Sequence, residues 1–320
     1  MNIIIRVMLA ATTFVLALPL SAQEYPQRPI RLVIGMPAGG TTDILGRVIA
    51  ARLGERLRQQ VVVDNRAGAS GMIAAELVAK SQADGYTLLM AGSSISNINN
   101  LYPKATLNVA RDLEPIAWIA TTSYIFAVHP SLPVTSMSEF IAYAKAHPGK
   151  LNYAGSSPGT VQHLSGELLQ RTAGFAMLYV PYKGTGLVMP DLLSGRLHAA
   201  FDNVLIMVPH IKSGALRGLG VTTPQRSAAI PELPAIGETV PGFQSIGWFG
   251  IFGPARIPGH IVKRLNALLA AFMNETDVRE RLLAQGAEPV SGPPELLRNQ
   301  LAREMEVWGK LIREAGLKVE

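Results

Sequence analysis

The sequence of 320 residues contains no cysteine, which excludes disulfides, metal sites built on thiolates and a lipid-modified N-terminal cysteine. Charged residues are also few, at 16% of the chain, and the basic residues behind the formal net charge of +6 are scattered rather than gathered in runs. Because nucleic-acid-binding proteins concentrate Lys and Arg on one stripe or helix, no nucleic-acid partner is expected. A mildly positive field would still favour an anionic ligand.

Long apolar runs are missing beyond the N-terminus. The chain begins with one early cation, Arg6, then an apolar run, then small residues up to Ala22, which is the layout of a secretory signal peptide. The run is short for a helix that spans a bilayer, so a membrane anchor is the weaker interpretation. We predict an exported protein whose signal peptide, residues 1–22, is cleaved near Ala22.

Short apolar runs alternate with segments of helical periodicity over most of the chain, and 48% of the residues are apolar. This alternation predicts an α/β protein with parallel sheets covered by helices on both faces. A helix is predicted at 137–147, where Ser136 and Glu139 have capping-box spacing. The predicted strands lie at 30–34, 61–65 and 84–92 in a first set, and at 125–129, 151–155, 178–184 and 197–203 in a second set that begins near residue 122.

The C-terminal part shows one glycine-rich strand, at 247–255, and then helical segments at 259–273, 275–285 and 293–315, without a further predicted strand. Helices alone cannot build a third sheet, so we expect them to return and cover the first one. This predicts two lobes joined by crossing segments, with a ligand site between them. The predicted division is 23–121 with 245–320 for lobe 1, and 122–244 for lobe 2.

Three glycine loops stand directly before predicted helices, at 37–42, 156–160 and 183–186. The first amides of a helix lack internal partners and the peptide dipoles add positive charge there, so each loop is a potential cradle for a carboxylate or phosphate. Glycine before a crossover helix is also common without any ligand. The loop at 37–42 matches neither a Walker A loop nor GxGxxG, so neither nucleotide binding nor any cofactor is predicted.

A serine hydrolase site and a metal site have weaker support in the sequence. The stretch GSSPG, residues 155–159, matches the nucleophile elbow of serine hydrolases with Ser157 as nucleophile, but Pro158 has no N–H to donate to an oxyanion. An acid and a histidine lie downstream without motif context: Asp191 or Asp202, with His198, His210 or His260. The six histidines are dispersed, and His163 with Glu167 lacks a third ligand, so no metal site is predicted.

At these loops the sequence resembles the Bug family, the TctC-like receptors of tripartite tricarboxylate transporters. The matching stretches cover nearly the whole mature chain in order: PIRLVIGMPAGGTTDILGR, VVVDNRAGASGMIAAELVAKSQADGYTLL, GSSPGTVQHLSGELL, VPYKGTG, PDLLSGRLHAAFDN, IKSGALRGLGVTTPQR, WFGIFGPARIP and LNALL. The resemblance implies a type II periplasmic-binding-protein fold, with two lobes of doubly wound sheets and an interlobe cleft.

In this family, main-chain amides, small hydroxyls and ordered water from the interlobe loops hold the ligand carboxylate. Carried over, the resemblance marks Ala38, Gly39, Gly40, Thr41, Asp43, Ser93 and Ser94 in lobe 1, and Ser156, Ser157, Gly159, Thr160, His163, Lys183, Gly184 and Asp202 in lobe 2. Two of these residues have competing roles. Asp43 could instead bind amides of its own helix start, and His163 could make a polar contact in the first turns of its helix.

The resemblance implies a periplasmic, monomeric receptor, not an enzyme, that captures a small organic acid and delivers it to membrane permease subunits. A slight preference for a dicarboxylate follows if two helix N-termini face each other. The alternatives are a sensory receptor that docks on a sensor kinase, and the Ser157 hydrolase. The family usually has proline and an aromatic residue where this chain has Gly35 and Met36, which predicts a looser backbone and a different fit to the non-carboxylate part of the ligand.

Overall fold

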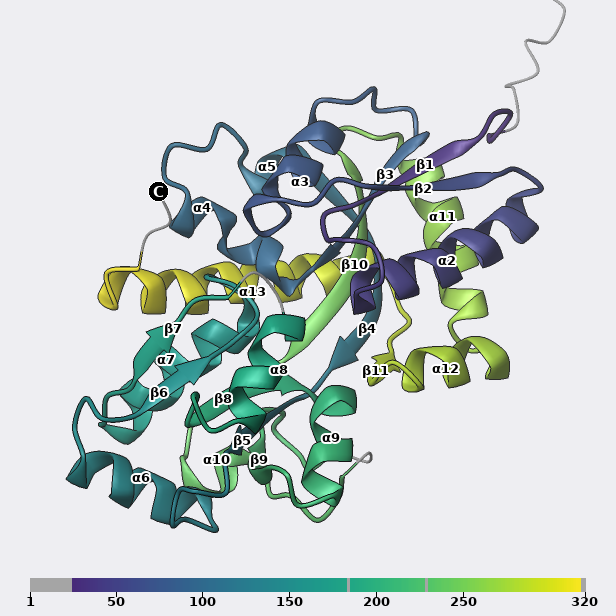
Figure 1. Cartoon of the computed structure of the whole chain (residues 1–320). Coiled ribbons are helices and arrows are strands. Elements are labelled where there is room, and N and C mark those ends of the chain that lie inside the picture. The colour runs from purple at the N-terminus through teal and green to yellow at the C-terminus, as the bar shows by residue number, and fades with distance from the viewer. Residues whose placement is uncertain (1–24, 183–184, 228–229, 318–320) are drawn as a thin grey trace, which may run out of the picture.

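The computed structural model describes residues 25–182, 185–227 and 230–317, which form two open sheets, each with its own helices (Figure 1). The first sheet has the strand order β11-β4-β10-β3-β1-β2. Its strands are β1 (Ile30–Ile34), β2 (Val61–Asn65), β3 (Thr87–Gly92), β4 (Leu113–Thr122), β10 (Gly247–Pro254) and β11 (Ala287–Pro289). We call the unit built on this sheet the first lobe.

The second sheet, on which the second lobe is built, has the order β7-β6-β8-β5-β9. Its strands are β5 (Tyr124–Val128), β6 (Asn152–Ala154), β7 (Leu178–Val180), β8 (Ala199–Asn203) and β9 (Arg217–Val221). In each sheet three neighbouring strands run parallel, but β10 is antiparallel to β3 and β4, and β5 is antiparallel to β8 and β9. The prediction of parallel sheets therefore applies to three strands of each sheet, and the antiparallel strands make both sheets mixed.

Helices cover the faces of both sheets. The long ones are α2 (Thr41–Leu57), α3 (Met72–Ala79), α6 (Met137–Ala146), α7 (Val161–Ala173), α8 (Thr185–Leu193), α9 (Val204–Lys212), α11 (Gly259–Phe272), α12 (Thr276–Leu283) and α13 (Pro294–Glu314). Single turns complete the set: η1 (Ala69–Gly71), η2 (Ser93–Asn97), α4 (Ile98–Leu101), α5 (Val109–Asp112) and α10 (Ile236–Thr239). None of the helices in the described part of the chain is long and apolar enough to cross a membrane.

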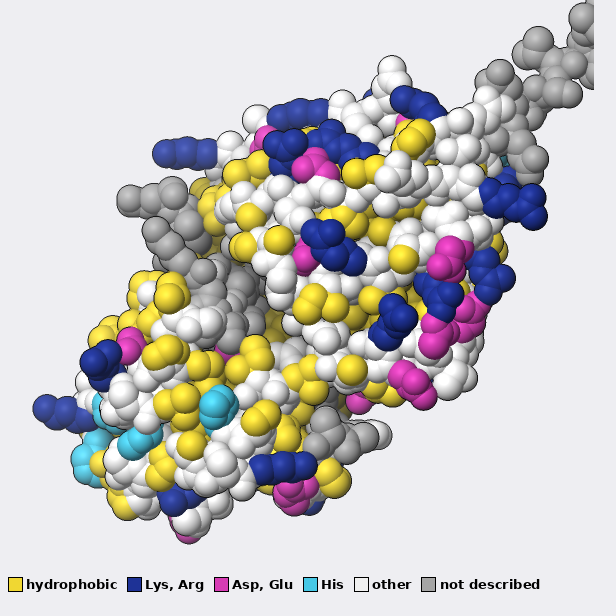
Figure 2. Space-filling model, turned by 45° about the vertical axis from the view of Figure 1, so that its right-hand side comes forward, with side chains coloured by type: hydrophobic (Ala, Val, Ile, Leu, Met, Phe, Trp, Pro, Cys, Tyr) yellow, Lys and Arg dark blue, Asp and Glu magenta, His cyan; other side chains and the backbone are white. Residues whose placement is uncertain are grey.

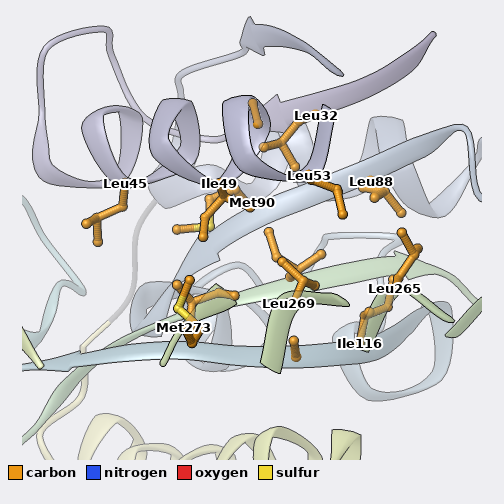
Figure 3. Packing of buried hydrophobic residues seen from close by; sticks show 14 of the residues in the cluster. Leu32, Leu45, Ile49, Leu53, Leu88, Met90, Ile116, Leu265, Leu269 and Met273 are labelled. Atoms are coloured by element: carbon orange, nitrogen blue, oxygen red, sulfur yellow. The ribbon is translucent and has the colours of Figure 1, made fainter. Parts of the chain in front are cut away.

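Strand alternation divides the first lobe's core between the two faces of its sheet. Leu32 on β1 lies close to Leu53 of α2 in Figure 3, and both belong to a buried cluster that also includes Leu265 of α11. The next residue, Val33, points to the other face and packs with Leu297 of α13. The C-terminal helices α11 and α13 thus pack on opposite faces of the first sheet.

Three strands were not predicted from the sequence: β4, β9 and β11. β4 was not predicted although it contains the apolar run 116–120, which follows Glu114 and Pro115. β9 contains two glycines and β11 has three residues, so neither of these two strands shows a clear apolar run. The expectation of no strand after residue 255 is wrong because β11 pairs with β4.

The lobes are joined tightly. β4 ends at Thr122 and β5 begins at Tyr124, so the chain passes from the first sheet to the second through a single residue, and it returns over 222–246. α13 runs along the junction in Figure 1, where its Trp308 belongs to a buried cluster with Leu101 of α4 and Leu164 of α7. This arrangement brings loops of both lobes together.

Candidate functional site

The loop that begins α2 follows β1, and Asp43 organises it. Gly39 has a φ of +84°, which glycine adopts at little cost, and its N–H donates to Asp43 Oδ2 at 2.9 Å. The carboxylate, 3% exposed, also accepts from Arg47 Nε at 3.0 Å and Asn65 Nδ2 at 2.9 Å. Burial alone would raise the pKa of Asp43, but these hydrogen bonds hold it below its ordinary value. Asp43 thus supplies a negative charge that stabilises its own loop.

The loop that begins α7 follows β6 and is built on the same plan. Gly159 has a φ of +76°, and its N–H donates to His163 Nδ1 at 3.0 Å. A ring nitrogen that accepts carries no proton, so the imidazole is neutral with its proton on Nε2. Burial lowers the pKa of His163 to about 4. The ring lies against Tyr179, and Nε2 has no hydrogen-bond partner among the described residues.

This second loop rests directly on the first lobe. Asn97 Nδ2 donates to Gly159 O at 2.9 Å, and Ser70 Oγ donates to Pro158 O at 3.3 Å. A Cβ on Gly159 would lie 2.1 Å from Leu101 Cδ1. Ser70, Asn97 and Leu101 all belong to the first lobe, so the loop at 155–160 forms an interlobe contact.

A small pocket of about 10 Å³, room for a single water molecule, lies in the first lobe beside this contact. Its lining includes Met36, Ser70 and Ser94, and Ser94 Oγ donates to Ser70 O at 3.1 Å. Ser70 and Ala69 adopt left-handed φ values of +55° and +46°, which is unusual for residues with a side chain. Backbone strain of this kind concentrates at functional sites.

The sequence-predicted residues fall into three groups. The largest group lies at the carboxyl ends of the parallel strands β1, β3 and β6, in the turns and helices that follow them. Its members are Ala38, Gly39, Gly40, Thr41, Asp43, Ser93, Ser94, Ser156, Ser157, Gly159, Thr160 and His163. Asp202 lies in β8, 1% exposed, and its Oδ1 accepts from Asn203 N–H at 2.7 Å. Lys183 and Gly184 lie outside the described residues.

Sequence reasoning missed Ser70, Gly71 and Asn97. A local signal existed for the first two, because RAGASG is a further glycine loop between a predicted strand and a helix. Asn97 had no such signal, since its partner Gly159 lies 62 residues away.

Gly35 corrects one expectation. A Cβ at Gly35 would lie 2.8 Å from the Cα of Gly71, so the absence of a side chain permits a close backbone approach rather than simply loosening the chain. Met36 is half-buried and packs against the first lobe's core.

The elbow-like stretch shows no catalytic triad. Within the described chain no hydrogen bond joins Ser157 Oγ to a histidine, and His163 uses Nδ1 for Gly159. The Ser157 carbonyl accepts from Thr160 Oγ1 at 2.7 Å, which is a turn interaction.

Two α/β lobes, a double crossing and strand-end loops that meet between the lobes define a solute-binding protein of the type II periplasmic-binding-protein fold, with its cleft between the lobes. Charged side chains of both signs are interspersed on the face in Figure 2 rather than massed at one site.

The comparisons place the chain within that class. The model of the tripartite tricarboxylate transporter family receptor, TctC, matches residues 45–317, and the chain belongs to this family. It is 37% identical to "Protein BugT" of Bordetella pertussis over 308 residues, 95% of this chain and 94% of that one.

Two similar solved structures are named together with the ligand that they contain. "R. palustris Rpa4515 with adipate" has a TM-score of 0.83 and 39% identity, over 92% of this chain and 100% of that chain. "MatC (Rpa3494) from Rhodopseudomonas palustris with bound malate" has a TM-score of 0.79 and 29% identity, over 90% and 100%. These relatives are binding proteins, and this chain is a solute-binding receptor rather than an enzyme.

Proposed function

We propose that this protein is an exported receptor that closes its two lobes around a small organic dicarboxylate. The observation that carries the proposal is the pair of glycine loops at the starts of α2 and α7, one in each lobe, with the second seated on the first lobe through Asn97 and Ser70. Helix N-termini offer unpaired amides and positive dipole ends to anions. Adipate and malate, named with two similar structures, are both dicarboxylates.

The proposed ligand contacts are the full set predicted from the sequence, Lys183, Gly184 and Asp202 included, with Ser70 added at the interlobe contact. Only a ligand that touches both lobes shifts a hinge equilibrium toward the closed form. We place the hinge at the predicted boundaries near residues 122 and 245.

The closed form would then dock on the permease subunits of a tripartite transporter, as the family description suggests. The working protein would be a periplasmic monomer with its signal peptide removed near Ala22. Uptake of labelled dicarboxylate in cells tests this role, and deletion of either receptor or permease should abolish it. If receptor deletion leaves uptake intact and abolishes ligand-induced transcription instead, the sensory role is correct.

Ligand class is tested by thermal unfolding of residues 23–320 with adipate, malate and the uncharged analogue adipamide. A ligand at about 100 times its Kd should stabilise the protein by about 2.7 kcal/mol. We expect this from a dicarboxylate and not from adipamide. Stabilisation by adipamide, with none from any carboxylate, would contradict the proposal.

A matched pair of variants locates the site. Gly39→Asp adds a carboxylate to the first loop, where a new Cβ meets nothing within 4 Å, so it should weaken dicarboxylate binding by about tenfold or more through charge repulsion. Gly149→Asp is the control: its φ is +72° and its Cβ is equally unhindered, but it lies after α6. Equal affinities of the two variants would remove the first loop from the site.

A further inference from the structure

A buried carboxyl group lies beneath the turn η2, which contributes Ser93 and Ser94 to the proposed ligand site. Glu304 projects from α13 and is 6% exposed. Its Oε2 accepts from Trp248 Nε1 at 2.7 Å, and its Oε1 accepts from Gln300 Nε2 at 2.9 Å. Oε2 also lies 3.2 Å from Ser96 Oγ, in the middle of the turn.

The distances from Ser96 Oγ to its neighbours constrain which group of this pair donates. The Ser96 hydroxyl is within hydrogen-bond distance of three oxygens: Ser93 O at 2.7 Å, Glu304 Oε2 at 3.2 Å and Asn97 Oδ1 at 3.3 Å. A hydroxyl donates one hydrogen, and the shortest contact assigns it to Ser93 O. The contact with Oε2 is then a hydrogen bond only if Glu304 is protonated and donates to Ser96 Oγ.

The same turn carries the interlobe contact. Asn97 follows Ser96, and its Nδ2 donates to Gly159 O of the second lobe. Ser96 and Asn97 are both fully buried, so a change in the hydrogen bonds of Ser96 must alter the turn rather than be absorbed by solvent. Glu304 therefore contacts a turn that begins with the two serines of the proposed ligand site and ends with Asn97, which makes the interlobe contact.

We propose that Glu304 acts in its protonated form as a positioning residue, donating to Ser96 Oγ and so holding the Ser93–Asn97 turn in the shape that binds ligand and contacts the second lobe. This inference rests on the proposed receptor function. Ionisation of Glu304 would draw the Ser96 hydroxyl away from Ser93 O and leave a buried charge, which favours opening of the lobes. A bound dianion would oppose that charge further.

The charges around Glu304 agree with this assignment. Burial raises the pKa of Glu304 to about 8, against the opposing effects of the hydrogen bonds from Trp248 and Gln300 and of the charge on Arg303. Tyr124 of β5 also faces this region. Its pKa is raised, first by burial and then by the charges of Asp202 and Glu304.

The other elements packed on α13 contribute charged groups that are engaged elsewhere. These are Glu114 of β4, bound to Arg298; Arg171 of α7, bound to Glu314; and Glu167 of α7, which accepts from Tyr153. From η2, β10 and α4 the groups that hydrogen-bond Glu304 or its turn are neutral, and His163 at the start of α7 is neutral as well.

Calorimetric titration of adipate between pH 6.5 and 9 tests the proposal, because adipate keeps both charges throughout that range. Wild-type affinity should be constant below pH 7 and fall above pH 8 by up to about tenfold per pH unit, the limit for one linked proton. Glu304→Gln, which cannot ionise, should bind within about fivefold of wild type at pH 6.5 and show no fall. The control Glu306→Gln, on an exposed position of the same helix, should keep the wild-type profile.

Infrared difference spectra of wild type and Glu304→Gln provide a readout that needs no ligand. At pH 7 the wild type should show a protonated carboxyl C=O band that the variant lacks. A missing band, or a wild-type affinity profile as flat as that of Glu304→Gln, would overturn the proposal. A wild-type protein that binds no dicarboxylate at any pH would instead contradict the receptor function, and the infrared band would still report the state of Glu304.

Discussion

The loops that begin α2 and α7 share one hydrogen-bonding pattern, but the side chain that accepts the bond differs between them. In each, a glycine with positive φ donates its N–H to the side chain four residues later: Gly39 to Asp43, and Gly159 to His163. The bond alone does not mark a ligand site, because α6 begins in a similar way, with Thr135 N–H donating to Glu139 at 2.7 Å. The two loops differ from each other in two respects: the charge of the side chain that accepts the bond, and the residues that cover the glycine.

In the first lobe the acceptor is an ionised carboxylate partnered by Arg47, and residues 38–40 are exposed. In the second lobe the acceptor is a neutral imidazole, and Gly159 is buried against Leu101. The first loop is therefore open to a ligand without touching the other lobe, whereas the second must also hold the lobes together. Changes in the first loop should alter ligand binding, and changes in the second should alter closure and stability.

The largest predicted difference follows from adding one methyl group to each glycine. Gly159→Ala should cost about 4 kcal/mol, from the left-handed φ and from overpacking against Leu101. Gly39→Ala should cost about 1 kcal/mol, because its φ is also positive but its Cβ meets nothing within 4 Å. Urea unfolding of the two variants measures both values.

A double variant separates the two causes at Gly159. If overpacking dominates, Leu101→Ala should relieve part of the cost of Gly159→Ala, and the double variant should be more stable than the sum of the single changes predicts. Strict additivity would show that the interlobe packing of Leu101 is not what demands glycine there.

Acid should act on the second loop before the first. The pKa of His163 in the folded protein, about 4, lies below its ordinary 6.5, so between these values the unfolded chain binds more protons and stability falls as pH drops from 6.5 to 4. This contribution amounts to about 3 kcal/mol. The pKa of Asp43 is lowered from 3.8, so its contribution is present above that pH and is lost only in stronger acid.

Urea unfolding at pH 7 and pH 4.5 checks this order. His163→Gln should lose less stability than wild type between the two pH values, and Asp43→Asn should lose as much as wild type. A His163→Gln profile parallel to that of wild type would show that the imidazole is not held neutral in the fold.

Much of this comparison was accessible from the sequence. The apolar runs predicted β1 and β6, and the glycine loops that follow them gave both candidate cradles. Of the capping box predicted at Ser136 and Glu139, the bond from Glu139 N–H to Ser136 Oγ forms, whereas the Glu139 carboxylate accepts from Thr135 N–H, one residue before the box. These features depend on residues within one turn or one strand, so local chemistry determines them.

The rest depends on contacts between distant segments. Nothing local announces that Asn97 will meet Gly159, or that β10 will insert antiparallel between β3 and β4. β9 was missed because its two glycines weaken the strand signal, and tertiary pairing with β5 overrides that weakness. The role of Asp43 stayed open in the sequence because one of its partners, Asn65, lies 22 residues away at the end of β2.

A smaller effect should come from the interlobe hydrogen bonds. Asn97→Ala removes a fully buried donor from Gly159 O and should weaken adipate binding by about tenfold, or about 1–2 kcal/mol. Ser70→Ala removes a longer bond from a half-buried side chain and should cost less than about threefold, or about 0.5 kcal/mol. Calorimetric titration compares them, and equal losses would mean that the two contacts share the closing force evenly.

The smallest effect tests whether the first loop determines which acid is bound. Met36 lines the small pocket beside Ser70 and Ser94, and its flexible thioether adapts to different ligand shapes. Met36→Phe substitutes a rigid ring at a half-buried position, so it should change the free energy of unfolding by no more than about 1 kcal/mol. It should change the ratio of the adipate and malate Kd values by about threefold, because the longer acid has more methylene groups to place. If both Kd values change by the same factor, the residue affects closure rather than ligand choice, and the division of roles between the two loops is wrong.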